Sequence, residues 1–313
     1  MTLGLDVPDW VRDATVEVFR AAVDRGRIER AGRLRVPDGV SVGPETRYCG
    51  DDPHQALAVY RPANAGGHFR PPLIVDIHGG GWVYGDLGVN HLYCSRLAEL
   101  GFMVANVAYR LQPGANLRDQ VQDLFAALHW LGAHADECGF DPGNVFLTGD
   151  SAGGHLAALI SCVDSSGREQ RIFGVAPDHG LSIRAVGIVN GVVEGTYRTS
   201  PGSPLLDVAD RALIKSMCGG DPEAPWRPYR SFAVFMKDVE LKPMFVVSGL
   251  SDPFYTQTRH LLDYLASRRA RVEPLIWPKD RRLGHVFNIM EVDWEESRRT
   301  NAAMCDYFRR WLR

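Results

Sequence analysis

Ser151 lies in a pattern that could make it a nucleophile, G-D-S-A-G at residues 149–153. A serine with glycine two residues before and after it matches the nucleophile elbow, in which the missing Cβ atoms leave room for a sharp turn. An apolar run at 145–147 precedes the pattern, and a segment suited to a helix follows at 155–160. We therefore expect a strand, a turn and a helix. Such a turn can also be a plain connection, and the pattern alone leaves both interpretations open.

A second glycine-rich segment, H-G-G-G-W at residues 78–82, follows the apolar run 72–77. Successive glycines let backbone N–H groups turn towards one point, and in elbow enzymes a loop of this kind completes the oxyanion hole. A phosphate-binding loop is the alternative, but neither G-x-G-x-x-G nor G-K-[ST] occurs there. We expect the oxyanion to be held by three N–H groups, those of Gly79, Gly80 and Ala152. Trp82 is predicted to be a wall of the substrate pocket, whereas His78 and Asp150 are predicted to be structural.

A serine hydroxyl needs an imidazole to remove its proton, and that imidazole needs a carboxylate to orient it. The elbow fold supplies these groups in the chain order serine, acid, histidine, each after a strand. Asp252 follows the predicted strand 243–249, and His285 lies in the loop after the last predicted strand, 272–277. Order and placement therefore predict a triad of Ser151, Asp252 and His285.

Other residues could take two of these roles. Among the histidines, His260 falls inside a predicted helix, His179 in a polar loop, and His155 on the elbow helix itself, which leaves His285 as the best placed. Asp252 could instead cap the helix that begins beyond it, and Asp280 is then the alternative acid.

Apolar strands that alternate with periodic helices predict parallel strands joined by right-handed crossovers. We predict strands at 33–36, 45–49, 56–60, 72–77, 102–107, 145–147, 183–189, 243–249 and 272–277, and helices at 8–24, 90–100, 117–130, 155–160, 207–217, 255–267 and 294–312. The polar segment 164–180 is predicted to be a loop. We expect an N-terminal cap helix region over 1–40, a catalytic domain over 41–313, and a cap insertion at 195–235.

Composition describes a globular protein: 45% of the 313 residues are hydrophobic and the formal net charge is −3. This charge gives no electrostatic reason to expect nucleic acid as a partner. The N-terminus shows no basic lead followed by an apolar run, and no stretch is apolar enough to span a bilayer, so we expect a cytoplasmic protein. The six cysteines lack metal-ligand spacing, and we expect no metal.

Taken together and in order, these segments resemble the hormone-sensitive-lipase-like esterases, which are α/β-hydrolases of the HGGG type. The matching segments are H-G-G-G-W at 78–82, Y-G-D at 84–86, Y-R-L at 109–111, G-D-S-A-G-G at 149–154, D-P at 252–253 and G-H-V-F at 284–287. The resemblance spans residue 56 to the end. It implies an α/β-hydrolase fold with a mostly parallel sheet of about eight strands flanked by helices, a helical cap, and carboxylic-ester hydrolysis without a cofactor.

The chain departs from the family pattern at 112–116, 252–256 and 286–287, and these departures concern the substrate more than the chemistry. We expect a serine hydrolase that cleaves small-molecule esters of short to medium acyl chains through an acyl-enzyme, and the sequence leaves a homodimer open. One alternative is a hydrolase for an amide, formamide or acetyl group on a specialised metabolite. Another is a non-catalytic binding protein, since some relatives are hormone receptors, but the presence of all three triad residues argues against it.

Overall fold

The computed structural model describes residues 7–30, 35–63, 65, 70–196 and 204–313. Its strands are β1 (Val40–Val42), β2 (Thr46–Arg47), β3 (Ala56–Pro62), β4 (Pro72–Ile77), β5 (Met103–Val107), β6 (Asp141–Asp150), β7 (Ile183–Val189), β8 (Met244–Gly249) and β9 (Val272–Trp277). Its longer helices are α1 (Asp9–Arg30), α2 (His91–Glu99), α3 (Leu117–Ala133), α5 (Ala152–Asp164), α6 (Gly167–Phe173), α7 (Pro204–Met217), α9 (Tyr255–Ser267) and α11 (Glu295–Arg309). Short helices are α4 (Ala135–Cys138), η1 (Arg227–Arg230), α8 (Phe232–Phe235) and α10 (Phe287–Met290).

Within the described residues, all strands form one sheet in the order β1-β3-β5-β4-β6-β7-β8-β9, with β2 paired to β3. The strands from β5 to β9 run parallel to one another, whereas β3 is antiparallel to β1, β2 and β5. The mostly parallel sheet and its antiparallel edge agree with the expected α/β-hydrolase fold. Because parallel strands end at the same edge, the loops after β4, β6, β8 and β9 can meet there.

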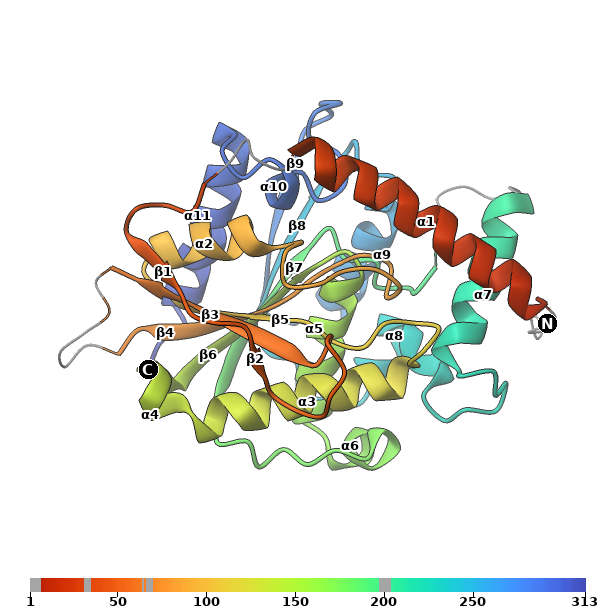
Figure 1. Cartoon of the computed structure of the whole chain (residues 1–313), viewed down its shortest axis with the longest axis horizontal. Coiled ribbons are helices and arrows are strands. Elements are labelled where there is room, and N and C mark those ends of the chain that lie inside the picture. The colour runs from red at the N-terminus through yellow and green to blue at the C-terminus, as the bar shows by residue number, and fades with distance from the viewer. Residues whose placement is uncertain (1–6, 31–34, 64, 66–69, 197–203) are drawn as a thin grey trace.

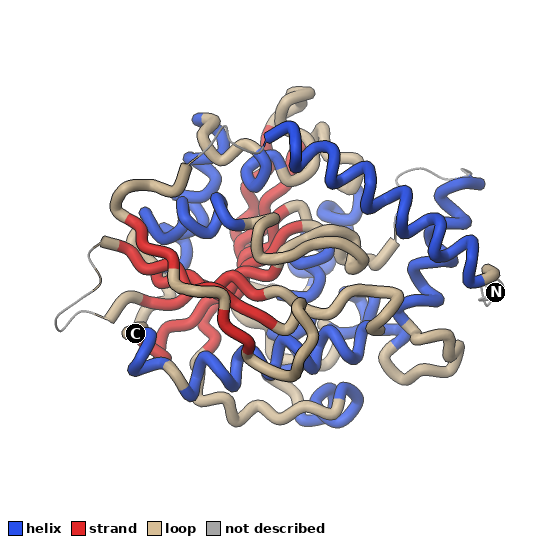
Figure 2. The backbone as a smooth tube through the Cα atoms, viewed as in Figure 1, coloured by secondary structure: helices blue, strands red, loops and turns tan. Residues whose placement is uncertain are grey.

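Helices cover both faces of the sheet, as Figures 1 and 2 show. One face carries α3, α5 and α9, whose apolar side chains form a buried cluster with those of Leu73, Val75 and Leu147. The other face carries α2 and α11, which pack on Ile74, Val104 and Phe146. The central strands are therefore buried on both faces, which explains why their sequences are continuous apolar runs.

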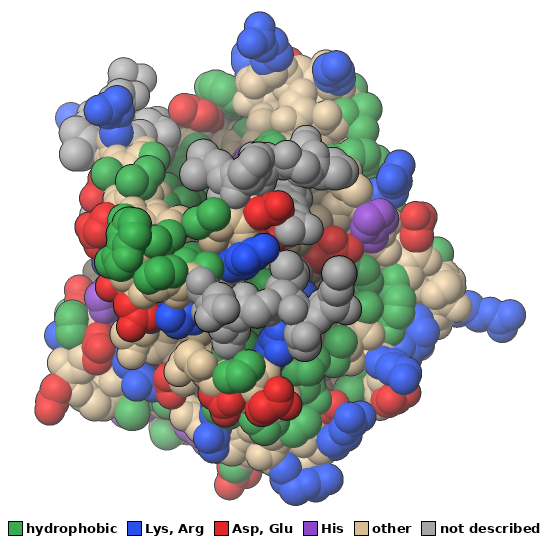
Figure 3. Space-filling view, turned by 90° about the vertical axis from the view of Figure 1, so that its right-hand side faces the viewer, with side chains coloured by type: hydrophobic (Ala, Val, Ile, Leu, Met, Phe, Trp, Pro, Cys, Tyr) green, Lys and Arg blue, Asp and Glu red, His purple; other side chains and the backbone are tan. Residues whose placement is uncertain are grey.

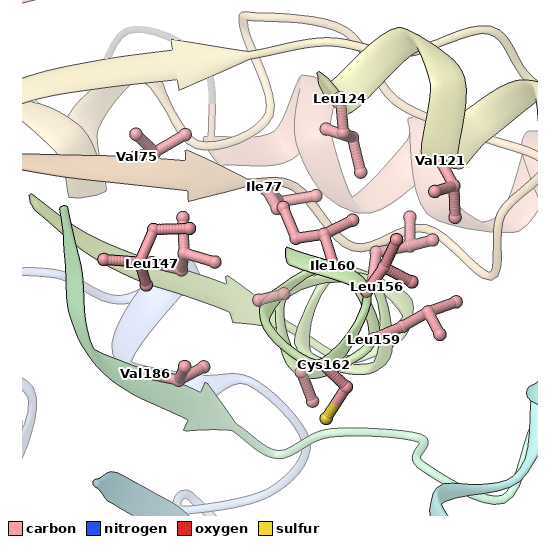
Figure 4. Close-up of a cluster of buried hydrophobic side chains, with 14 of the residues drawn as sticks. Val75, Ile77, Val121, Leu124, Leu147, Leu156, Leu159, Ile160, Cys162 and Val186 are labelled. Carbon is pink, nitrogen blue, oxygen red and sulfur yellow. The ribbon is translucent and has the colours of Figure 1, made fainter. Parts of the chain in front are cut away.

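Helix α5, which follows Ser151, is the most deeply buried of the helices that support the site. Its side chains Leu156, Leu159 and Ile160 lie between the sheet and α3 in Figure 4, and each is fully buried. Burial of one such side chain stabilises a fold by about 1.5–3 kcal/mol. Core packing thus fixes α5, the helix that follows the turn at Ser151.

Several elements differ from the sequence predictions. Residues 167–173 form α6 where we predicted a loop, because the buried side chains of Glu169 and Phe173 attach this polar segment to the protein. The strand predicted at 33–36 lies partly outside the described residues, and Arg35 and Val36 belong to no strand. Helix α1 continues to Arg30, beyond the predicted end at residue 24.

Helices α1 and α7 lie side by side at the right of Figure 1, away from the sheet. They are joined by Lys215, whose Nζ donates to Val7 O at 2.8 Å and to Asp9 Oδ1 at 2.6 Å. Figure 3 shows this side of the molecule, where hydrophobic side chains and charges of both signs are mixed.

Candidate active site

The turn at Ser151 has the strained backbone expected of a nucleophile elbow. Strand β6 ends at Asp150, α5 begins at Ala152, and Ser151 between them has φ 52° and ψ −118°, a conformation that residues other than glycine rarely adopt. A Cβ on Gly153 would overlap the carbonyl oxygen of Ile77, and one on Gly149 would overlap the backbone of Gly153. Both glycines are therefore required by close approach of the backbone.

The structure brings Ser151, His285 and Asp252 together, although they are far apart in the chain. His285 Nε2 lies 2.9 Å from Ser151 Oγ, and His285 Nδ1 lies 3.0 Å from Asp252 Oδ1. The side chain of Asp252 is fully buried and that of His285 is 25% exposed. Such a chain of hydrogen bonds can move a proton from a hydroxyl to an imidazole while a carboxylate fixes the ring.

Asp252 is held by more than His285. Asn190 Nδ2 donates to its Oδ2 at 2.6 Å, and the N–H of Phe254 donates to its Oδ1 at 2.9 Å. Burial acts to raise the pKa of Asp252, but the hydrogen bond and charge of His285, with the Asn190 and Phe254 donors, hold that pKa below its ordinary value. The carboxylate is therefore ionised at neutral pH.

The N–H of Gly79 does not point to the Ser151 side chain, because it donates to Asp150 Oδ1 at 2.9 Å. This differs from our expectation that Gly79 contributes to the oxyanion hole. Gly80 follows with φ 107° and borders the same cavity as Ser151. Ala152 is the first residue of α5, and the N–H groups of a helix's first turn lack partners within the helix.

A cavity of about 200 Å³ opens beside Ser151 and His285. Besides Gly79, Gly80, Gly81, Asp150 and these two side chains, its wall is formed by Phe19, Val23, Trp82, Tyr84, Val89, Val192, Phe254, Val286, Ile289 and Met290. Phe19 and Val23 come from α1, so the N-terminal helix roofs the cavity. A wall so rich in apolar side chains suits a hydrocarbon chain.

Trp82 borders this cavity, and its indole is fully buried. Its Nε1 donates to Nδ1 of His155 at 3.4 Å, and Nε2 of His155 lies 3.0 Å from the carbonyl oxygen of Tyr229. Burial lowers the pKa of His155 to about 4, so this histidine is neutral. Trp82 therefore contributes to the position of the glycine loop as well as to the wall.

The other candidates from the sequence lie elsewhere. His179 is buried against Asp164 at 2.9 Å, and His260 is an exposed partner of Glu194 at 3.0 Å. Asp280, the alternative acid, pairs with Arg282 at 2.9 Å. His78 stacks on Tyr109 with ring centroids 4.5 Å apart, and burial lowers the pKa of His78 to about 4, which agrees with a structural role.

Sequence reasoning missed two amides that hold the site's carboxylates. Asn190 follows the last residue of β7 and binds Asp252, while Asn90 precedes α2 and donates to Asp150 Oδ1 at 2.8 Å. A signal for Asn190 was present, because a polar residue directly after a buried parallel strand faces the edge where sites form. Nothing in the local sequence distinguishes Asn90 from an ordinary helix cap.

Within the described residues, no group of three or more His, Cys, Asp or Glu side chains is arranged to hold a metal ion. No helix in this part of the chain combines the length and apolar character needed to cross a membrane.

Comparison with known proteins agrees with this fold. A family model described as the α/β-hydrolase fold matches residues 74–287. The crystal structure of esterase B from Lactobacillus rhamnosis is 34% identical, with a TM-score of 0.88 and coverage of 96% of each chain. A bacterial heroin esterase is 27% identical, with a TM-score of 0.69 and coverage of 94% of this chain and 91% of the other.

Among sequence relatives, the probable carboxylic ester hydrolase LipM of Mycobacterium tuberculosis is 29% identical over 224 residues, which are 70% of this chain and 50% of LipM. The chain spans about half the length of the curated relatives it matches. The chain belongs to the α/β-hydrolase fold family, in its hormone-sensitive-lipase-like group of esterases.

Proposed function

We propose that this protein is a carboxylic-ester hydrolase that works through an acyl-enzyme. The observation that carries the proposal is the hydrogen-bonded chain from Ser151 through His285 to Asp252, with distances of 2.9 and 3.0 Å. Ser151 attacks the ester carbonyl as His285 takes its proton, and Asp252 stabilises the resulting imidazolium. His285 then gives the proton to the leaving alkoxide. Water, activated by the same imidazole, releases the acid and restores the serine.

The proposed oxyanion hole consists of the N–H groups of Gly80 and Ala152. The positive end of the α5 dipole supports the developing negative charge there. Gly79 has a different role in this proposal: its N–H is bound to Asp150 and thereby fixes the loop that carries Gly80. Loss of one oxyanion donor lowers kcat by about 10²–10³.

The proposed substrates are small-molecule esters of short to medium acyl chains. The cavity beside Ser151 is small, about 200 Å³, and its wall is mostly apolar, which supports acyl chains of limited length. Esterase B, at 34% identity, has also been solved inhibited by a C4-C4 tributyrin phosphonate, which supports a short chain. Longer chains would need α1 to move or a path out of the cavity.

The test is hydrolysis of p-nitrophenyl esters from acetate to palmitate by the wild-type protein and by Ser151→Ala. We expect turnover that peaks at short chains and is lost in Ser151→Ala, while circular dichroism shows both proteins folded. Equal activity in the two proteins would remove Ser151 from the mechanism. No turnover of any ester by the folded wild-type protein would contradict ester hydrolysis as the function.

Three further predictions belong with this function. We propose that α1 and the segment 195–235 act as a cap over a catalytic domain. The homodimer and the cytoplasmic location also stay predictions. Light scattering of the purified protein tests the homodimer, and fractionation of cells tests the cytoplasmic location.

A further inference from the structure

Two buried carboxylates lie under the glycine loop and share one amide. Asn90 Nδ2 donates to Asp76 Oδ2 at 2.9 Å and to Asp150 Oδ1 at 2.8 Å, so its two hydrogens are divided between the two acids. Asp150 Oδ1 also accepts the N–H of Gly79 at 2.9 Å. Asp76 and Asn90 are fully buried, and Asp150 is 4% exposed. The loop after β4 is therefore tied to Asp76 through Asp150 and Asn90.

No lysine or arginine in the described part of the chain forms an ion pair with either carboxylate. The charge of Asp150, from β6, acts on Asp76, and the other titratable groups around Asp76 are Cys94 and Tyr93 from α2 and Tyr60 from β3. Burial raises the pKa of Cys94, Tyr93 and Tyr60, so these three groups are neutral. Two buried carboxylate charges without a nearby cation would destabilise the fold far more than one such charge. The pair of Asp76 and Asp150 therefore retains one proton.

The contacts indicate which acid holds the proton. Burial raises the pKa of Asp150, but its Oδ1 accepts N–H groups from Asn90 and Gly79, and these hydrogen bonds and the charge of His285 act to lower it. Asp76 accepts from Asn90 and from the Cys94 thiol, at 3.3 Å, on Oδ2 alone, and its buried Oδ1 has no partner in the described residues. Burial and the charge of Asp150 raise the pKa of Asp76 to about 7. Asp76 is therefore the neutral acid and Asp150 the ionised one.

We propose that Asp76 is a positioning residue for the oxyanion hole, and that in its protonated form it lets Asn90 and Asp150 hold the glycine loop in place. The proposal rests on the esterase function above. Loss of the proton places a second negative charge across Asn90 from Asp150. Repulsion between the carboxylates then displaces Asp150, and with it Gly79 and the neighbouring Gly80 N–H.

The pH dependence of catalysis follows from this arrangement. As the pH rises through the pKa of Asp76, kcat should fall relative to that of a variant that cannot ionise at this position, whereas KM should change little because an oxyanion donor acts mainly on the transition state. The loop loosens without losing its donor, so this relative fall should be smaller than the 10²–10³ of a deleted donor, and we expect about tenfold between pH 6 and pH 9.

The test measures the ratio of kcat at pH 9 to kcat at pH 6 with p-nitrophenyl butyrate in a pH-stat. Asp76→Asn keeps the shape and an acceptor for Asn90 but cannot ionise, so its ratio should rise about tenfold above the wild-type ratio. Asp76→Leu removes the acceptor and should lower kcat at both pH values. Asp280→Asn is the matched control, since Asp280 is bound to Arg282 and its pKa is lowered, and it should keep the wild-type ratio.

An unchanged ratio in folded Asp76→Asn would overturn the proposal. A second measurement covers the case in which the variants do not fold: infrared spectra of the wild-type protein in D₂O should show the carbonyl band of a protonated carboxylic acid at pH 6, which disappears by pH 9. Absence of that band at pH 6 would equally overturn the proposal. The infrared readout needs no turnover, so it separates failure of this network from failure of the esterase function, which the Ser151→Ala comparison reports.

Discussion

Two regions of the molecule are built in different ways: the edge of the sheet, where the loops with Ser151, Asp252 and His285 meet, and the roof, which is formed by helices α1 and α7. At the edge, Ser151 and Asp252 follow buried parallel strands, and their side chains are joined through His285 by hydrogen bonds of 2.9 and 3.0 Å. In the roof, α1 meets the catalytic part through Val16, Phe19 and Val23, which pack on Val83, Tyr84 and Val89, and through a few hydrogen bonds such as that of Arg20 to Val83 O at 2.9 Å.

This difference leads us to expect that the edge determines the rate of the chemical step and the roof determines which substrate is preferred. Chemistry that needs reacting atoms within a fraction of an ångström is placed on elements that the core holds rigid. We expect selection among acyl chains to depend on α1, a helix with a small packed surface that can change without disturbing the reacting groups. Changes at the edge should therefore affect kcat, and changes in the roof should affect which ester is preferred.

The largest expected effect is at the edge, from Asp252→Asn. Loss of the carboxylate that orients His285 should lower kcat by about 10⁴, as loss of the acid does in other serine hydrolases. Asp280→Asn, which alters the alternative acid, should leave kcat within a factor of about two, because Asp280 is bound to Arg282 and lies outside the hydrogen-bonded chain. Single-turnover kinetics with p-nitrophenyl butyrate checks both. Equal losses in the two variants would contradict the assignment of the acid.

The second effect concerns the elbow. Gly153→Ala places a Cβ against the carbonyl oxygens of Ile77 and His78, both backbone atoms that cannot move aside cheaply. We expect a loss of about 1–3 kcal/mol in the free energy of unfolding, as for overpacked cores. Gly167→Ala is the control, since its Cβ meets only ordinary contacts in helix α6 and alanine favours helix. Urea unfolding of both variants measures this difference. An unfolding midpoint of Gly153→Ala equal to that of the wild type would exclude the close approach of residue 153 to the carbonyl oxygen of Ile77.

The sequence predicts the regular strands and helices better than the features that tertiary contacts decide, and the reasons are physical. Strands β7 and β9 and helix α9 occupy the residues predicted for them, and in β7 the apolar run follows the burial of a central strand. Helix α6 was missed because its stability depends on tertiary contacts such as the hydrogen bond from Tyr229 to Glu169. The Gly79 N–H was misassigned because a run of glycines does not reveal which way each amide points.

The third effect belongs to the roof. Phe19→Ala removes a ring from the wall of the cavity and should shift the preferred p-nitrophenyl ester to a longer chain. Burial of one more methylene contributes about 0.8 kcal/mol, so room for one in place of the ring should raise the ratio of kcat/KM for octanoate to that for butyrate about fourfold. Val18→Ala, on the exposed side of the same helix with 72% of Val18 accessible, should leave that ratio unchanged. The same shift in both variants would mean that the helix acts through its stability rather than its inner face.

The smallest effect is expected from Lys215→Met, which breaks the link between α7 and the start of α1. The side chain of Asp9 is 66% exposed, so the ion pair is largely screened by water, and we expect Tm to fall by no more than about 2 °C. Because Val7 O also loses its donor, the N-terminal end of α1 should open more often, and proteolysis near residue 9 should be faster than in wild type.

Arg168→Met, which breaks an exposed pair at 3.9 Å with Asp238 far from α1, is the control and should not change that cleavage. If the two variants are cleaved at the same rate, the Lys215 contacts do not hold the N-terminal end of α1. The packing of Phe19 and Val23, with the hydrogen bonds of Arg20 to Val83 O and of Tyr84 to Asp24, then decides how easily α1 leaves the cavity.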